Sequence, residues 1–229
     1  MTRIYVILSI VLTVGALAAS LILYPQLPEK IPTHWNIQGE IDGYGQKEWA
    51  AFLVPGIMLG LLLMFWALPY LSPKQFAVDH FRTTYWFIAT VVLGMTAFIH
   101  GLTLWAALAD QQQPVDITRL MLAGLLIMFA LIGNVMGKVR RNFYVGVRTP
   151  WTLASERVWN DTHRLAGRMF VGGAIIGLLA VVLPLPLPAA TIAVIAIIMT
   201  AALCPVLYSL ILYKRLEKRG ELASEKPLG

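Results

Sequence analysis

Side chains that could do chemistry gather first in segment 27–49, which separates two long apolar runs. It holds His34, Asn36, Asp42 and Lys47 among prolines and glycines that favour defined turns. The imidazole, amide and carboxylate could converge to hydrogen-bond a ligand or coordinate a metal ion. A metal is the weaker interpretation, because one histidine and one carboxylate fall short of a usual ligand set. The favoured interpretation is structural, since Asn and Asp side chains often bond the backbone of their own loop.

A second polar segment, 133–168, is rich in basic and aromatic residues. Thr149 and Pro150 make a good helix start, a hydroxyl cap followed by proline at the first helical position. We expect one amphipathic helix from Pro150 towards His163 that lies in the membrane interface and leads into the fifth apolar run. The residues expected on its membrane side are Trp151, Ala154, Val158 and part of Trp159.

The same segment offers a candidate surface for a cytoplasmic partner, although attachment of a basic loop to anionic lipid is the favoured interpretation. Asn134 lies inside an apolar run and is expected to hydrogen-bond another helix. The candidate residues for a partner site or a structural motif are Asn134, Asn142, Arg148, Thr149, Trp151, Trp159, His163 and Arg164.

Two further reactive side chains lie within apolar runs. His100 marks a possible functional position, because ionisable groups inside a bilayer are costly. A neutral histidine bonded to a neighbouring helix is the commoner case. Cys204 is the one cysteine, so no intrachain disulfide can form, and a packing role is expected.

The elements that position these residues are transmembrane helices. Of 229 residues, 58% are hydrophobic and 13% are charged, and the mean hydropathy is +0.71. A helix needs about 20 apolar residues to cross a hydrocarbon core of about 30 Å. We therefore predict an all-α, polytopic bundle of six spans. The expected spans are 4–24, 49–71, 84–109, 120–137, 169–183 and 189–213.

Basic residues predict the orientation of the bundle. If both termini are in the cytoplasm, the only Lys and Arg residues on the outer side are Lys30, Lys47 and Arg119, and the rest of the 18 are cytoplasmic. The 12 acidic residues divide equally between the two sides. This is the bias of the positive-inside rule. The prediction is a two-span unit, 1–72, with an extracytoplasmic loop at 25–48, and a four-span unit, 73–229, with a cytoplasmic loop at 138–168.

Both polar segments resemble signatures of SdpI-type membrane proteins. The segment IPTHWNIQGEIDGYGQK resembles the first outer loop of that family, a short domain of unknown function. The second signature is resembled by GNVMGKVRRNFYVGVRTPWTLASERVWNDTHR. Residues that match the family pattern are Pro32, His34, Asn36, Gly39, Asp42, Lys47, Asn134, Asn142, Gly146, Arg148, Thr149, Pro150, Trp151, Trp159 and His163.

The resemblance implies a relative of an immunity protein that shields a sporulating bacterium from its own sporulation-delaying toxin. That protein also sequesters a transcriptional repressor, so a peptide toxin outside and a transcriptional regulator inside are the implied partners. The resemblance implies no catalytic residue and no cofactor, and a fold alone does not transfer a function.

We therefore expect a non-enzymatic immunity or sensor protein of the bacterial inner membrane. The alternative is a transporter or channel accessory protein, and a weaker one is a membrane enzyme that acts on lipid or cell-wall precursors. Membrane lipids are expected partners, direct nucleic-acid binding is not expected, and glycine-rich helix faces allow a homodimer.

Overall fold

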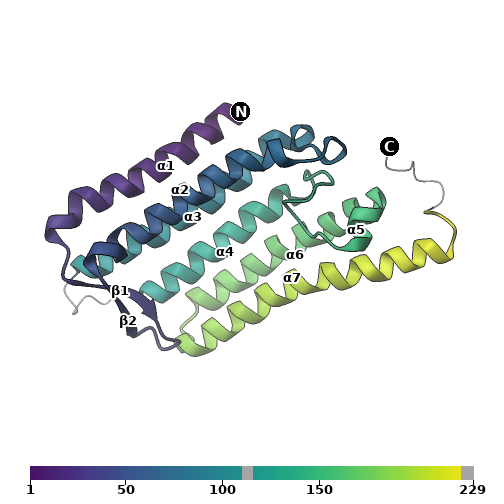
Figure 1. Cartoon of the computed structure of the whole chain (residues 1–229). Helices are drawn as coiled ribbons and strands as arrows, with labels where there is room; N and C mark the ends of the chain where they lie inside the picture. Colours follow the sequence, from purple (N-terminus) through teal and green to yellow (C-terminus); the bar gives the residue numbers. More distant parts are fainter. Residues whose placement is uncertain (110–115, 223–229) are drawn as a thin grey trace.

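The computed structural model describes residues 1–109 and 116–222 and is almost entirely helical (Figure 1). Six helices are long and apolar enough to cross a membrane, which confirms the predicted helical bundle of six spans. The β-hairpin is an addition that the all-α prediction lacked. The main elements are α1 (Thr2–Leu23), β1 (Lys30–Trp35), β2 (Ile41–Gln46), α2 (Lys47–Leu71), α3 (Arg82–Leu108), α4 (Ile117–Met136), α5 (Pro150–Ala154), α6 (Glu156–Val182) and α7 (Leu187–Lys218), with short 3₁₀ helices at Tyr24–Gln26, Lys74–Phe76 and Val78–Phe81.

The bundle has two distinct ends, which we call the hairpin end and the loop end. The hairpin end carries β1 and β2, and the loop end carries residues 72–81 and 137–149. Thr2 lies at the loop end, where its hydroxyl is 2.7 Å from that of Thr83. Glu221 lies there too, because its carboxylate accepts a 2.5 Å hydrogen bond from Arg157. The first and last described residues are therefore on one side of the bundle.

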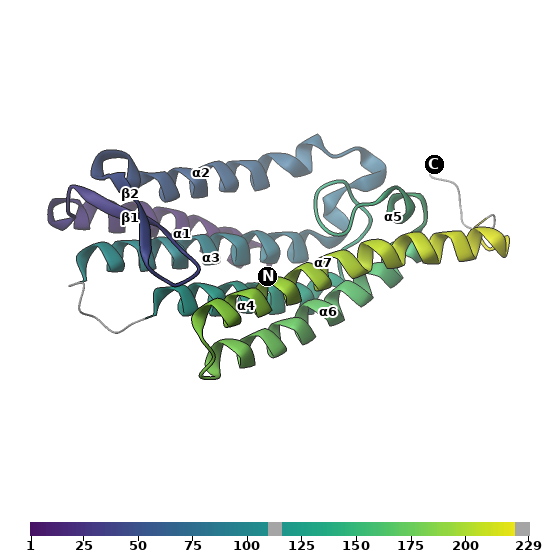
Figure 2. The same cartoon turned by 90° about the horizontal axis from the view of Figure 1, so that it is seen from below.

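Helix α3 is central to the packing. It packs against α1 and α2 on one side and against α4 on the other, while α4, α6 and α7 pack together (Figure 2). Helices α1 and α3 run parallel, because their hydroxyl pairs Thr2–Thr83 and Ser9–Thr90 are each 81 residues apart. Side-chain hydroxyls thus join two largely apolar helices, a common device in membrane bundles.

His100 closes the same interface near the hairpin end. The Ser20 hydroxyl donates to the Ala51 carbonyl over 2.6 Å, so the His100 Nε2–H donates to the Ser20 oxygen over 2.9 Å. His100 is 2% exposed. The expectation that it bonds a neighbouring helix is confirmed, and the bond ties α1, α2 and α3 together at one level.

The predicted interfacial helix from Pro150 to His163 is wrong in two respects. The chain breaks at Ser155, whose backbone is extended and whose hydroxyl caps a new helix by accepting from the Val158 N–H. Helix α6 then continues without interruption to Val182, so it begins well before the predicted start at Met169. Val158 and Trp159 are fully buried in the protein and do not face the membrane.

Candidate functional site

The hairpin is built around Asn36. Its side-chain oxygen accepts hydrogen bonds from the backbone N–H groups of Gln38 and Glu40, at 3.0 and 2.9 Å, and its amide donates to the Glu40 carboxylate. Gly39 has a φ of +84°, a conformation that glycine adopts without strain. Asn36 therefore holds the tight turn between β1 and β2 and supports the structural interpretation of this residue.

His34 and Asp42 do meet, as one sequence interpretation allowed. The His34 Nδ1 lies 2.5 Å from the Asp42 carboxylate, and the two side chains are 70% and 44% exposed. An exposed pair of this kind contributes little to stability. Among the described residues, no third His, Cys, Asp or Glu completes a cluster around them.

Lys47 has a local role at the start of α2. Its ammonium lies 4.8 Å from the centre of the Tyr24 ring, and its backbone N–H donates to the Glu29 carbonyl over 3.0 Å. Both contacts join the start of α2 to the segment between α1 and β1. The four predicted residues of the outer loop therefore do not form one cluster.

A cavity of about 820 Å³ lies between the hairpin and the ends of α3, α4 and α7. Its walls combine aromatic and charged side chains from segments far apart in the chain. They include Trp35, Tyr44, Trp105, Lys30, Glu40 and Asp116. This size falls within the range of small-ligand sites, about 300–1,000 Å³.

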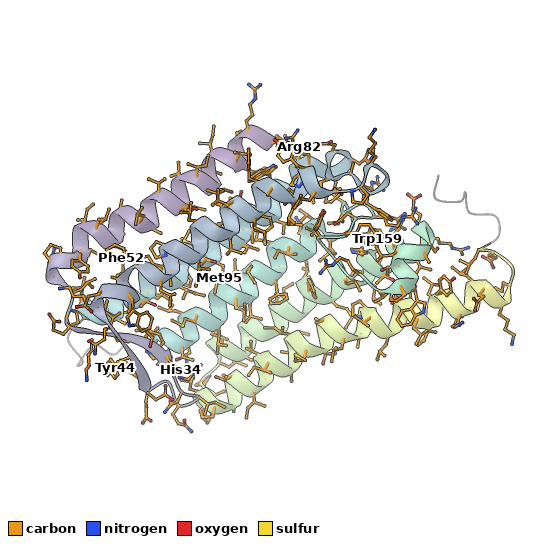
Figure 3. The ribbon with its side chains drawn as sticks, viewed as in Figure 1. His34, Tyr44, Phe52, Arg82, Met95 and Trp159 are labelled. Carbon is orange, nitrogen blue, oxygen red and sulfur yellow. The ribbon has the colours of Figure 1, made fainter. Side chains whose placement is uncertain are left out.

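The pairing of the two strands explains why His34 and Asp42 are not part of the cavity. The pairs Pro32–Tyr44 and Trp35–Ile41 line it, and the pair His34–Gly43 lies between them. A register shift between Pro32 and His34 interrupts the alternation of faces, and the His34 side chain is solvent-exposed and does not line the cavity. Asp42 contacts His34 and does not line the cavity either. His34 and Tyr44 are labelled on the hairpin in Figure 3.

Sequence reasoning missed these cavity residues, although a signal for them existed. Trp35 and Tyr44 are large aromatic residues in a loop whose candidate binding residues were chosen only among its polar side chains. The sequence could not predict that Asp116 lies next to the hairpin, because the two are far apart in the chain. Arg119 forms a 2.9 Å ion pair with Asp116. The same guanidinium donates hydrogen bonds to the carbonyls of Val181, in the last turn of α6, and Leu185, between α6 and α7.

At the loop end, Asn142 organises residues 140–145. Its oxygen accepts from the backbone N–H groups of Tyr144 and Val145, and its amide donates to the Arg140 and Val145 carbonyls, all within 3.0 Å. Asn142 is fully buried. All its polar capacity is used within the loop, so its role is structural.

Trp159 and His163 attach that loop to α6. The two rings stack with centroids 4.0 Å apart, and the indole N–H of Trp159 donates to the Val139 carbonyl over 2.8 Å. The Nδ1–H of His163 donates to the Trp159 carbonyl, and its Nε2 accepts from the Val147 N–H over 3.1 Å. Both ring nitrogens of His163 are occupied, so the imidazole has a defined tautomer.

Thr149 caps α5 as the sequence predicted. It forms a reciprocal capping box with Thr152, and Pro150 occupies the first turn. The Thr149 hydroxyl also lies 3.1 Å from that of Ser209 on α7. The cap therefore attaches the loop to a second helix.

The remaining predicted residues of this segment lie towards the surface. Arg148 is exposed and donates to the Phe143 carbonyl, and Arg164 lies 3.9 Å from Asp161. Trp151 is half-buried. Asn134 is exposed and makes no hydrogen bond among the described residues, which contradicts the expected bond to another helix. Its side chain is exposed on α4, so it is not enclosed at a contact between helices.

The fold and these sites define a multi-pass helical membrane protein with a β-hairpin at one end and, at the other, a loop held by hydrogen bonds. Residues 138–209 match the SdpI/YfhL protein family, and residues 11–59 match a domain of unknown function (DUF1648). The chain is 30% identical to the immunity protein SdpI of Bacillus subtilis (strain 168) over 165 residues, which cover 72% of this chain and 75% of that protein.

The chain belongs to the SdpI/YfhL family, which confirms the resemblance seen in the sequence. The family match begins just before Asn142 and includes the loop, α5, α6 and most of α7. No solved structure matches the chain.

Proposed function

We propose that this membrane protein provides immunity against a membrane-active peptide and that the hairpin-end cavity binds part of that peptide. The relative is named an immunity protein, which supports the first half of the proposal. The cavity supports the second half, because Trp35, Tyr44 and Trp105 offer apolar surface beside side chains of both charges. Aromatic residues in a partly enclosed site contribute strongly to peptide binding.

The proposed orientation places the hairpin end outside the cell and the loop end in the cytoplasm of a bacterium with this protein in its inner membrane. The excess of Lys and Arg at the loop end supports it. A secreted peptide would then reach the cavity before it entered the bilayer. The proposed action is binding without catalysis.

The loop end would serve a second, sensory role in this proposal. Arg148 on the loop and Arg164 on α6 are exposed, whereas Asn142, Thr149, Trp159 and His163 are buried in the fold. These two guanidinium groups are available to a cytoplasmic regulator, and they are the residues to replace when signalling is tested.

The immunity proposal is tested by survival of a peptide-sensitive bacterium that expresses the protein. Wild type should raise the lethal concentration of at least one peptide in a panel that includes the sporulation-delaying toxin. Trp35→Ala and Tyr44→Ala should each reduce protection by about tenfold at equal membrane abundance. His34→Ala is the matched control, because this side chain lies on the same hairpin and does not line the cavity.

Two results would contradict the proposal. If wild type protects against no peptide, the immunity role is absent. If His34→Ala loses as much protection as Trp35→Ala, the cavity is not the binding site.

A further inference from the structure

A basic cleft lies at the loop end, between the start of α3 and the end of α4. It has a volume of about 560 Å³ and is lined by Thr2, residues 79–84, Gly137, Lys138 and Arg140. Arg82, Lys138 and Arg140 bring three permanent cations to it. Asp79 is the carboxylate of the cleft and lies 3.7 Å from Arg82. Lys138 and Arg140 form no ion pair among the described residues, so the cleft has surplus positive charge.

An apolar groove of about 560 Å³ adjoins this cleft. Its walls are Val6 and Ile7 of α1, Trp66 of α2 and Trp86 of α3. Trp86 is buried and forms the floor, while Trp66 is 58% exposed at the rim. Because the rise of a helix is about 1.5 Å per residue, the groove follows α1 for about 7 Å from Thr2 to Ile7.

The cleft and the groove share two residues, Thr2 and Arg82. Figure 3 shows Arg82 at the loop end beside the first turn of α1. Arg3 adds a further cation at the mouth of the groove. A compartment that attracts anions thus lies next to a compartment that prefers hydrocarbon.

We propose that this combined site binds one anionic phospholipid from the leaflet at the loop end. The phosphate would lie in the cleft among Arg82, Lys138 and Arg140, and one acyl chain would lie in the groove against Trp66 and Trp86. Guanidinium groups pair well with phosphate oxygens. A free phosphate would use the cleft alone, so the apolar groove beside the cleft points to a lipid as the occupant. The site is separate from the hairpin-end cavity and does not depend on the proposed immunity function.

The experiment uses the full chain purified in a neutral detergent. Native mass spectrometry measures retention of phosphatidylglycerol against phosphatidylcholine of the same acyl chains. Wild type should retain one phosphatidylglycerol in preference to phosphatidylcholine. The double variant Lys138→Gln/Arg140→Gln should weaken that retention by about tenfold or more, because each basic residue contributes to attraction of anionic lipid.

The matched control is Lys218→Gln/Arg215→Gln, which removes the same charge from the loop end at a distance from the cleft. It should retain the lipid as wild type does. A second variant, Ile7→Trp, fills the groove without changing charge and should also reduce retention. Glycerol phosphate, which lacks acyl chains, should not compete. All variants should elute as folded protein in size-exclusion chromatography.

Three results would overturn the proposal. Wild type could show no preference for phosphatidylglycerol. The control double variant could lose the lipid as strongly as the cleft variant, which would indicate general attraction to basic residues. Glycerol phosphate could compete fully, which would make the site one for free phosphate esters.

Discussion

At the scale of single residues, Gly146 shows how closely the loop packs against α6. Its φ is +110°, and a Cβ atom at this position would lie 2.2 Å from the His163 Nε2. The imidazole cannot move away easily, because its other nitrogen is bonded to the Trp159 carbonyl at 2.7 Å. Glycine is therefore required here for two reasons, its backbone conformation and the absence of a side chain.

Gly146→Ala should destabilise the protein by about 2–4 kcal/mol, because it adds backbone strain and a steric clash. The measurement is the midpoint of thermal unfolding in detergent. Gly172→Ala is the control, since a Cβ atom there meets nothing within 4 Å. Equal unfolding midpoints for the two variants would show that the loop does not contact His163 in this way.

At the scale of elements, the hairpin depends on its turn more than on the exposed contact between His34 and Asp42. Asn36 makes several hydrogen bonds inside the turn, whereas His34 and Asp42 make one contact in solvent. The tip of the hairpin also lies against the start of α7, where a Cβ on Gly39 would meet the Leu187 side chain at 2.6 Å. The turn thus determines the shape of the cavity wall.

Asn36→Ala should lower the free energy of opening the turn by about 1–2 kcal/mol, because two backbone N–H groups lose their acceptor. Cleavage after Glu40 by a glutamate-specific protease should become about tenfold faster, since local opening exposes this bond. His34→Ala should change the rate little, because a contact between two solvent-exposed polar side chains contributes under about 1 kcal/mol. A faster rate in both variants, to the same extent, would argue that the exposed pair supports the turn.

At the scale of the whole molecule, the structure places both described ends of the chain at the loop end. This agrees with an even number of spans. The side of the membrane that each end faces remains a prediction from the basic residues. Because Cys204 is the one cysteine in the sequence, introduced cysteines can report this orientation directly.

In a Cys204→Ala background, Gln38→Cys at the hairpin tip should react with a membrane-impermeant maleimide in intact cells. Lys218→Cys, at the loop end, should react only after the inner membrane is permeabilised. Both side chains are exposed, so accessibility within the protein does not limit labelling. The reverse pattern would invert the proposed topology and separate the cavity from an extracellular peptide.

The sequence alone determined the features that depend on neighbours along the chain. The six spans follow from the length and hydropathy of apolar runs. The cap at Thr149 and the family signatures could also be read directly. The prediction of two units, 1–72 and 73–229, stays a prediction.

Only the tertiary structure decided the features that depend on distant segments. The cavity could not be predicted, because residues such as Trp35, Trp105 and Asp116 belong to different elements that meet at one end of the bundle. The burial of Trp159 was missed for the same reason. A hydrophobic helix face predicts that something apolar will cover it, and in a membrane protein either lipid or protein can do so. Here the loop that precedes the helix folds back and accepts the indole N–H, so protein covers Trp159.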